Sequence, residues 1–444
     1  MPSSSSRRRL LWRGLIALVV VLVIAGAVAA FVLLHKPGNV SHPNVQFTQP
    51  TTTTAPPQRH RTKLVDNFEW PWYGFDAGRT RFFAATPKLR PPLHVGWRFN
   101  DGALLEFPPV IYHTSLFVMD DDGSARALNV LNGHVRWVRK IGTLAAGSPA
   151  VAAEDQLVVM PVLSVHGHSP GGGRFLALSM KTGRIVWSHS IPAGTESSPI
   201  VRGHTAYFGD QGGTVWSIDV RNGHVNWTYH ASGPVKGGPA LVGDNLYFGD
   251  YAGRAYDISA GTGHQIWAVG TNGAHFGFGS GNFYATPAVA FGRVYMGNTD
   301  GRVYSFGART GALAWATGTG AYVYASASVA DTPGLGPTLY VGSYDGNFYA
   351  FNAQSGAVRW RHHAGGRISG SSTIIGNVVY YSDLGSKTST GLDATTGRTV
   401  FSFPDGAFTP VIADYHAIYL DGYGAMYQLL PGAGPHRKRA ARHG

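Results

Sequence analysis

The sequence predicts an all-β protein: an eight-bladed β-propeller of four-stranded antiparallel blades, preceded by one N-terminal transmembrane helix. Three observations lead to this fold class. The 444 residues include 60 Gly, and only 14% of them are charged, which is typical of a β-rich array. A unit with a period near 40 residues repeats along the chain, as it does in propellers. A run of twenty apolar residues stands close to the N-terminus.

The transmembrane helix is predicted over residues 15–34, which read LIALVVVLVIAGAVAAFVLL. At a rise of 1.5 Å per residue, this run covers roughly the 30 Å of a bilayer core. Four arginines precede it, so the positive-inside rule places residues 1–14 in the cytoplasm and the rest of the chain outside. A cleaved signal peptide with a small-residue site at residues 27–30 is the alternative, but the apolar run continues beyond that site and is long for a signal peptide. We therefore expect a single-pass anchor in the cytoplasmic membrane.

The segments that flank the repeat differ from it in composition. Residues 35–65 are Pro/Thr-rich without apolar periodicity and are expected to form an extracytoplasmic linker, and residues 432–444 are expected to form a disordered basic tail. The net charge of +12 comes entirely from residues 1–63 and from the tail, because the 24 basic and 24 acidic residues between them balance. A body without a basic excess argues against nucleic-acid binding. No cysteine occurs, which excludes a disulfide framework and a lipidated cysteine.

The repeat is marked by a two-residue turn ending in glycine, followed four residues later by an aromatic residue. Glycine supplies the positive φ of a tight hairpin, and the fixed offset places a large ring on one face of the next strand. We interpret these rings, together with Trp97, as wedges that dock each blade on its neighbour. The seven turns are Asn132-Gly133, Thr182-Gly183, Asn222-Gly223, Thr262-Gly263, Thr310-Gly311, Ser355-Gly356 and Thr396-Gly397. The aromatic residues that follow them are Trp137, Trp187, Trp227, Trp267, Trp315, Trp360 and Phe401.

Each unit contains four predicted antiparallel strands and no helix. Such a sheet cannot bury both faces alone, so the units must stack radially. An incomplete unit stands at each end: residues 94–99 supply a tryptophan strand, and residues 408–430 supply three strands without one. Pairing between them would complete an eighth blade, so that residues 66–431 form a closed ring without an open sheet edge.

The order of Pro-x-Val, Tyr-x-Gly, Asp-Gly, Ala-x-Asp, Thr-Gly and Trp in this unit resembles the pyrroloquinoline-quinone (PQQ) repeat. Quinoprotein dehydrogenases share that repeat with the non-catalytic outer-membrane assembly factors of the BamB type. The resemblance covers roughly residues 68–430, and WPWYGFDAGRTRF at residues 70–82 is similar to the segment that precedes the first blade in many such propellers. Because both groups use the repeat for packing, the resemblance implies the fold and leaves catalysis open.

The dehydrogenases hold PQQ over the propeller axis with a calcium ion, an aspartate base, carboxylate and amide ligands and often a pair of neighbouring cysteines. Glu106 in LLEFPPVI is similar in position to a PQQ-contacting glutamate of those enzymes. The chain has no cysteine and only four glutamates, from which we cannot assemble the six to eight oxygen ligands that calcium prefers. Glu106 is therefore either a cofactor contact or a solvated residue ahead of a strand, and the sequence predicts no catalytic residue and no metal site.

Two longer connections are candidate partner or ligand loops, because loops on rigid scaffolds often carry binding. The first, residues 165–173, contains His166 and His168, which lack a third metal ligand nearby and otherwise belong to an elongated hairpin loop. The second, residues 270–286, contains His275, Phe276 and Phe278 among glycines. These aromatic residues either form a binding surface or fold onto the rim of the blade.

The sequence therefore favours a non-catalytic protein-interaction or ligand-binding scaffold, anchored in the membrane and displayed in the cell envelope. The expected partner is a cell-envelope protein or a small ligand, since BamB-type proteins dock to other envelope proteins. A transmembrane anchor in place of a lipid distinguishes the chain from that type. The alternative is a PQQ- and calcium-dependent dehydrogenase of alcohols or sugars that uses Glu106.

Overall fold

A computed structural model describes residues 12, 14–27, 38–50, 67–166, 172–271, 281–406, 408 and 411–432. The chain divides into two compact units, Met1–Asn39 and Val40–Gly444. In the first unit, residues 14–27 are helical. No helix in the described part of the chain is long and apolar enough to cross a membrane, and residues 28–34 of the predicted span lie outside that part.

The second unit is an eight-bladed β-propeller, as the sequence predicts. Seven sheets contain four consecutive antiparallel strands, and the eighth joins the three C-terminal strands to a strand from the start of the unit. In blades 1 to 4 the strands are β5 (Val110–Tyr112), β6 (Ser115–Met119), β7 (Ser124–Asn129), β8 (Val135–Lys140), β9 (Ala150–Ala152), β10 (Leu157–Val162), β11 (Gly173–Ser179), β12 (Ile185–Ile191), β13 (Ile200–Arg202), β14 (Thr205–Gly209), β15 (Thr214–Asp219), β16 (Val225–His230), β17 (Ala240–Val242), β18 (Asn245–Gly249), β19 (Arg254–Ser259) and β20 (Gln265–Gly270). In blades 5 to 8 they are β21 (Ala288–Ala290), β22 (Arg293–Asn298), β23 (Arg302–Gly307), β24 (Leu313–Gly318), β25 (Ser328–Thr332), β26 (Gly336–Gly342), β27 (Asn347–Asn352), β28 (Val358–His363), β29 (Thr373–Ile375), β30 (Val378–Ser382), β31 (Ser389–Asp393), β32 (Thr399–Phe403), β33 (Val411–Ala413), β34 (Ile418–Asp421), β35 (Ala425–Pro431) and β4 (Leu93–Asn100).

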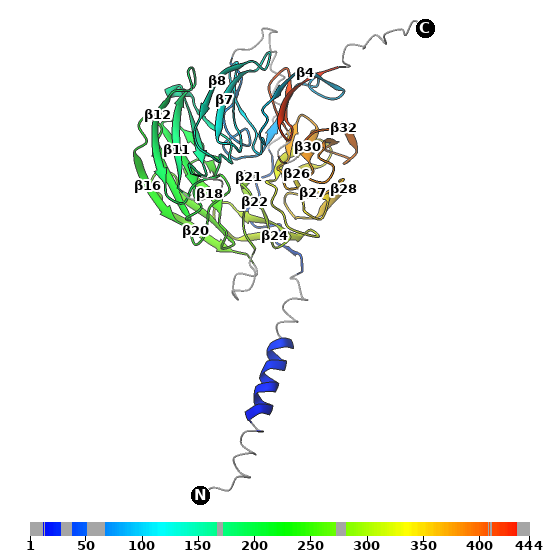
Figure 1. The fold of residues 1–444 in the computed structure, drawn as a ribbon. Helices are drawn as coiled ribbons and strands as arrows, with labels where there is room; N and C mark the ends of the chain where they lie inside the picture. The colour runs from blue at the N-terminus through cyan, green and yellow to red at the C-terminus, as the bar shows by residue number, and fades with distance from the viewer. Residues whose placement is uncertain are drawn as a thin grey trace. The chain divides into compact units, whose positions relative to one another are not determined.

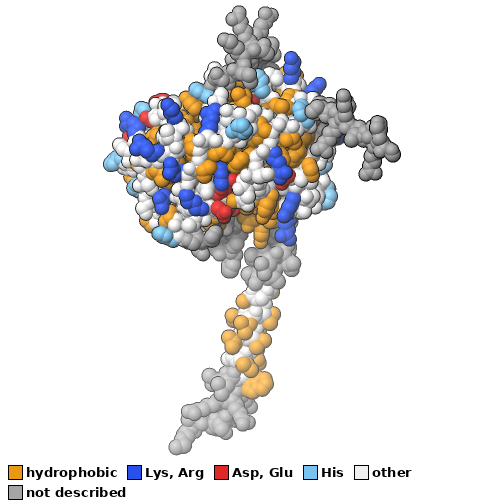
Figure 2. All heavy atoms as spheres, turned by 45° about the horizontal axis from the view of Figure 1, so that its top comes forward, with side chains coloured by type: hydrophobic (Ala, Val, Ile, Leu, Met, Phe, Trp, Pro, Cys, Tyr) orange, Lys and Arg blue, Asp and Glu red, His pale blue; other side chains and the backbone are white. Residues whose placement is uncertain are grey.

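The blades surround a central axis, with the first strand of each blade innermost and the fourth at the rim, as β12, β16, β20 and β28 show (Figure 1). The inner and middle strands are short and almost entirely buried, whereas the outer strands are more exposed, except β24, which β1 covers. This pattern follows from radial stacking, because the middle of each sheet is covered by neighbouring blades on both faces and the rim meets water. Lys and Arg side chains are scattered singly over the face shown in Figure 2, with hydrophobic side chains between them.

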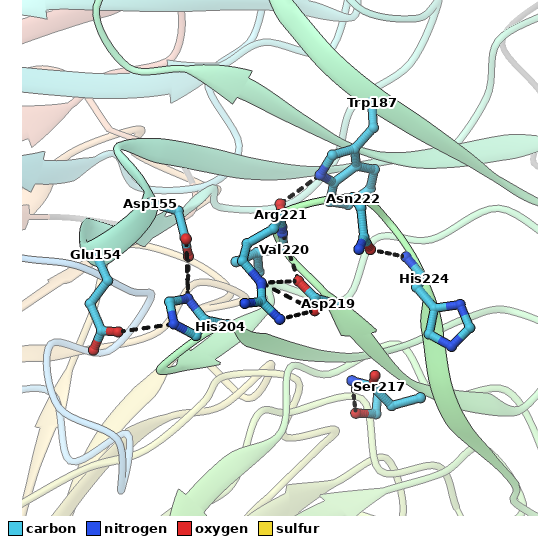
Figure 3. Close-up of polar contacts among 11 residues, drawn as sticks. Glu154, Asp155, Trp187, His204, Ser217, Asp219, Val220, Arg221, Asn222 and His224 are labelled. Atoms are coloured by element: carbon cyan, nitrogen blue, oxygen red, sulfur yellow. Dashed lines mark hydrogen bonds and ion pairs between the residues drawn. The ribbon is translucent and has the colours of Figure 1, made fainter.

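In seven of the eight blades, a tryptophan of the outer strand contacts the next blade. Trp187 in β12 donates its indole N–H to the carbonyl of Val220 in blade 3 at 2.5 Å (Figure 3). A Cβ on Gly223 would lie 2.8 Å from the Trp187 ring, so this turn needs glycine for space as well as for its φ of 77°. At the same joint, His204 of blade 3 lies 2.9 Å from Asp155, which ends the short 3-10 helix η1 (Ala153–Asp155) of blade 2. The same indole bond joins Trp97 to Val130, Trp137 to Met180, Trp227 to Ala260, Trp267 to Ala308, Trp315 to Ala353 and Trp360 to Ala394.

Blade 7 has Phe401 at the position of these tryptophans. Phe401 has no N–H to donate and packs against Tyr380 and Phe403, with ring centroids 5.9 Å and 6.3 Å away. The neighbouring blade 8 is the one that closes the ring, where β4 pairs antiparallel with β35 and Trp97 lies opposite Gln428. Gln428 donates its side-chain amide to the same Val130 carbonyl that accepts the Trp97 indole N–H, which joins both strands of the closure to blade 1.

Residues 68–83, which we call the leading segment, run along the inner strands. The segment contributes β2 (Glu69–Trp70), paired with β5, and β3 (Phe82–Phe83), paired with β29, while β1 (Val40–Ser41) adds to the outer strand β24. The carbonyls of the leading segment accept hydrogen bonds from backbone N–H groups in or directly after the inner strands of six blades. The acceptors are Phe68, Pro71, Ala77, Gly78, Thr80 and Arg81, and the donors are His113, Val151, Leu241, Val289, Val329 and Ile374.

Blade 3 is held to the leading segment by a side chain. Arg79 is fully buried, and its guanidinium donates to the carbonyls of Ser198 and Pro199 at 3.0 Å, of Pro239 at 2.9 Å and of Tyr73. The segment thus binds seven blades near the axis.

Candidate functional site

Loops gather at one end of the propeller, which we call the axial face. Because successive strands alternate in direction, the turns between second and third strands meet the connections between blades at this end. In six blades the same backbone hydrogen bond, 2.8 to 3.1 Å long, joins the two kinds of loop and makes the axial face a rigid frame. Its donors are Asp121, Gln211, Tyr251, Thr299, Tyr344 and Leu384, and its acceptors are Leu104, Gly194, Pro234, Asn282, Tyr322 and Arg367.

The fourth residue before each inner strand takes a ring position around the axis. The described ring positions hold Glu106, Ala146, Glu196, Lys236, Tyr284, Tyr324 and Ser369. All of them except Ala146 line a cavity of about 50 Å³ on the axis. One half of the ring therefore carries carboxylates and the other half carries tyrosines, with Lys236 between them.

Charged groups of the ring are paired across neighbouring blades. The Lys236 ammonium lies 2.8 Å from a Glu196 carboxylate oxygen and faces the rings of Tyr251 and Tyr284, 5.0 Å and 6.0 Å from their centroids. Burial, assisted by the carboxylates of Asp121 and Glu196, raises the pKa of Glu106 to about 7, which Lys236 partly opposes. Glu106 can thus hold or release a proton near neutral pH.

Tyr73 of the leading segment also lines the axial cavity. Its hydroxyl bonds to the Ser371 hydroxyl and lies 3.4 Å from that of Ser326. Burial would raise the pKa of Tyr73, but the Arg81 guanidinium, 4.7 Å from its ring centroid, and the two serines bring it below the ordinary value. The Tyr73 hydroxyl is therefore already hydrogen-bonded by groups of the chain itself.

Tyrosines continue outward from the ring across blades 4 to 6. The ring centroids of Tyr251 and Tyr284 are 6.2 Å apart, those of Tyr284 and Tyr324 are 5.5 Å apart, and those of Tyr324 and Tyr344 are 5.0 Å apart. Tyr322 lies 5.9 Å from Tyr324 and is 53% exposed. We call these five side chains the tyrosine arc.

The structure brings together only part of what the sequence suggests. Glu106 lines the axial cavity, and His166 is described next to Ser164, whose hydroxyl donates to its carbonyl at 2.8 Å. No group of three or more His, Cys, Asp or Glu able to hold a metal ion occurs in the described part of the chain. His168, His275, Phe276 and Phe278 lie outside the described residues.

Five further residues at ring positions that line the axial cavity were not predicted from the sequence. Glu196, Lys236, Tyr284, Tyr324 and Ser369 share with Glu106 the place four residues ahead of an inner strand. Aligning the repeat units on the first residues of their inner strands identifies these residues. The position recurs in each unit, but the type of side chain at that position differs.

The residues around the axis do not fit PQQ with calcium as they lie in this structure. A cavity of about 50 Å³ has room for one or two water molecules, whereas sites for small organic ligands usually measure about 300 to 1,000 Å³. Calcium prefers six to eight oxygen ligands. The only carboxylates lining the cavity in the described part of the chain are those of Glu106 and Glu196, and Glu196 is already paired with Lys236.

Comparison with known proteins identifies the family. A family model described as "Outer membrane protein assembly factor BamB" matches residues 121–332 and 299–431. The chain belongs to this BamB family. No curated protein sequence matches the chain.

Solved structures similar to this BamB-family chain include both kinds of PQQ-repeat propeller. BamB from Moraxella catarrhalis is 17% identical, with a TM-score of 0.62, and the match covers 76% of this chain and 99% of that one. A europium-containing methanol dehydrogenase is 13% identical, with a TM-score of 0.67 over 83% of this chain and 98% of that one. The quinohemoprotein alcohol dehydrogenase ADHIIG from Pseudomonas putida HK5 is 13% identical, with a TM-score of 0.67 over 86% and 85% of the two chains. At these identities the likeness shows the fold alone.

Proposed function

We propose that the chain is a non-catalytic, membrane-anchored scaffold whose axial face binds another protein of the cell envelope. The tyrosine arc carries this proposal. Tyrosine and arginine are enriched among the residues that dominate protein interfaces, and the arc presents five tyrosines on a frame held by repeated backbone hydrogen bonds. Membership of the BamB family supports a role in protein assembly, since its description names an assembly factor.

The proposed location rests on the N-terminal sequence. The apolar run at residues 15–34, preceded by arginines, supports a single-pass anchor with the propeller outside the cytoplasmic membrane. The Pro/Thr-rich linker that follows would then separate the propeller from the bilayer.

A PQQ-dependent dehydrogenase remains the second candidate, because Glu106 lines the axial cavity with its pKa raised to about 7 and the fold is similar to that of two dehydrogenases. The cavity volume and the Lys236–Glu196 pair oppose it. Calorimetric titration of the full chain with PQQ and calcium, with dye reduction tested on alcohols and sugars, separates the two. Stoichiometric binding with turnover would overturn the non-catalytic proposal.

The scaffold itself is tested by photo-cross-linking in intact cells. A photoreactive residue is placed at Tyr322 on the axial face, and in a control chain at Leu131, which is 51% exposed in a turn at the opposite end of the propeller. We expect a discrete cross-linked envelope protein from position 322 and none from position 131. Equal products from both positions, or none from position 322, would contradict the proposed docking face.

A further inference from the structure

The outer part of the tyrosine arc encloses a recess. Tyr322, Tyr324, Tyr344, Arg367 and Ala321 line a space of about 370 Å³ that is open to solvent. The planes of Tyr322 and Tyr324 meet at 86°, and those of Tyr324 and Tyr344 at 63°. We call this space the tyrosine recess.

The Tyr344 wall of the recess is held in place before anything binds. The Tyr344 N–H donates to the Tyr322 carbonyl at 2.9 Å, and the Tyr344 hydroxyl donates to Ser369 Oγ at 3.4 Å. A tyrosine has only two side-chain torsions to order, so a wall of tyrosines loses little conformational entropy when it is covered. Preorganisation of this kind lowers the entropic cost of binding.

The shape of the recess favours an extended peptide. The ring centroids of Tyr322, Tyr324 and Tyr344 lie 5.0 to 6.4 Å apart, so the tilted rings touch one another and form one angled aromatic wall. Polyproline II segments bind on aromatic-lined surfaces of this kind, because their backbone is already extended and proline rings pack on aromatic faces. Arg367 is the one charged side chain that lines the recess among the described residues.

The charge beside the recess indicates an acidic sequence. Arg367 is exposed, and its guanidinium lies 6.0 Å from the centroid of the Tyr344 ring. Among the ion pairs of the described residues, none involves Arg367. This cation in the lining of the recess is complementary to acidic side chains.

We infer that the tyrosine recess binds an extended, proline-containing acidic segment of the partner protein. The inference rests on the proposed scaffold function and names the chemistry that the axial face recognises. Prolines pack in the recess against the rings of Tyr322, Tyr324 and Tyr344. Glutamate or aspartate side chains of the segment pair with Arg367.

The test uses the full chain in detergent and three fluorescein-labelled peptides, followed by fluorescence anisotropy. The peptides contain three Pro-Pro-Glu units, three Pro-Pro-Lys units or three Gly-Ser-Glu units. We expect the first to bind at least about tenfold more tightly than the other two. Tyr322→Ala weakens that binding about tenfold, and Arg367→Glu reverses the preference toward the lysine peptide. Tyr112→Ala, at the last residue of β5 and next to a turn at the opposite end of the propeller, is the matched control and leaves the affinity unchanged.

Each other outcome overturns the inference in a different way. If the Pro-Pro-Glu and Gly-Ser-Glu peptides bind equally well, charge alone is recognised. If polygalacturonate binds more tightly than any of the peptides, the ligand is an anionic glycan. If no peptide binds while the cross-link from position 322 persists, the ligand chemistry is wrong and the scaffold stands. If both the binding and the cross-link fail, the docking face itself is wrong.

Discussion

Replacing Arg79 with methionine tests whether the leading segment holds the propeller together. Methionine keeps an unbranched apolar side chain and removes the guanidinium. In the native protein this group is fully buried and donates to the carbonyls of Pro239, Ser198, Pro199 and Tyr73. Those carbonyls lose their charged donor in the variant.

The expected loss follows from two opposing effects. A hydrogen bond to a charged group contributes about 1.5 to 3 kcal/mol, and a buried carbonyl left without a donor costs about 1 to 3 kcal/mol. Removing the guanidinium also removes the cost of burying its charge. Burial lowers the pKa of Arg79 to about 9, because it disfavours the charged form of the side chain. Because four carbonyls lose a donor and removal of the buried charge offsets part of that cost, we expect Arg79→Met to lower the free energy of unfolding by about 3 to 5 kcal/mol.

Guanidinium chloride unfolding followed by tryptophan fluorescence measures the effect. Arg398→Met, whose native side chain is exposed, is the matched control and is expected to change the free energy of unfolding by less than about 0.5 kcal/mol. Arg79→Lys keeps a charge but cannot reproduce the planar fork, so it should lie between the two. A loss below about 1 kcal/mol in Arg79→Met would refute the role of Arg79 as the link between the leading segment and blade 3.

Three further predictions concern the blade joints and the axial ring. Gly223→Ala should destabilise the propeller by about 1 to 3 kcal/mol, because its Cβ would lie 2.8 Å from the Trp187 ring, and Gly203→Ala, with open space around it, should lose less in the same denaturant assay. Since the pKa of Glu106 is raised from 4.5 to about 7, stability should fall as pH rises between these values and should fall less in Glu106→Gln, as thermal unfolding across that range will show. Lys236→Met should raise the carboxyl titration midpoint of Glu106 in infrared or NMR spectra, because the ammonium lowers it in the native protein.

The fold was predictable because its rules are local. A glycine turn and an aromatic residue four positions later define the joint between blades, and both can be read from a short stretch of sequence. Trp187 and Gly223 show that the two signals belong to different blades, since each tryptophan packs against the glycine of the following turn. The repeat therefore encodes the interface between units as well as the unit itself.

The candidate site was only partly predictable, because it is made from positions that repeat without repeating their chemistry. Glu106 was singled out by its likeness to a family position, but Glu196 and Lys236 have no motif around them. The tyrosine arc combines residues such as Tyr324 and Tyr344 from two kinds of loop, which meet through backbone hydrogen bonds and ring contacts. No spacing of residues in the sequence predicts that these two kinds of loop lie side by side.

The leading segment was recognised as an aromatic stretch, but its function in the fold was not. Six of its contacts with blades are made by backbone carbonyls, which leave no side-chain signature. Arg79 and Arg81 are usually surface residue types, so their burial could not be anticipated from composition.

The ring is closed in two independent ways, and this bears on where ligands can act. The pairing of β4 with β35 completes blade 8, while the leading segment binds seven other blades near the axis. Tyr73 of that segment lines the axial cavity, so the space that would hold a cofactor in a propeller enzyme is bounded by the protein's own chain. Binding energy is then available mainly at the outer part of the axial face, where Tyr322 of the tyrosine arc is exposed, and a ligand there gains contacts without displacing the groups that stabilise the ring.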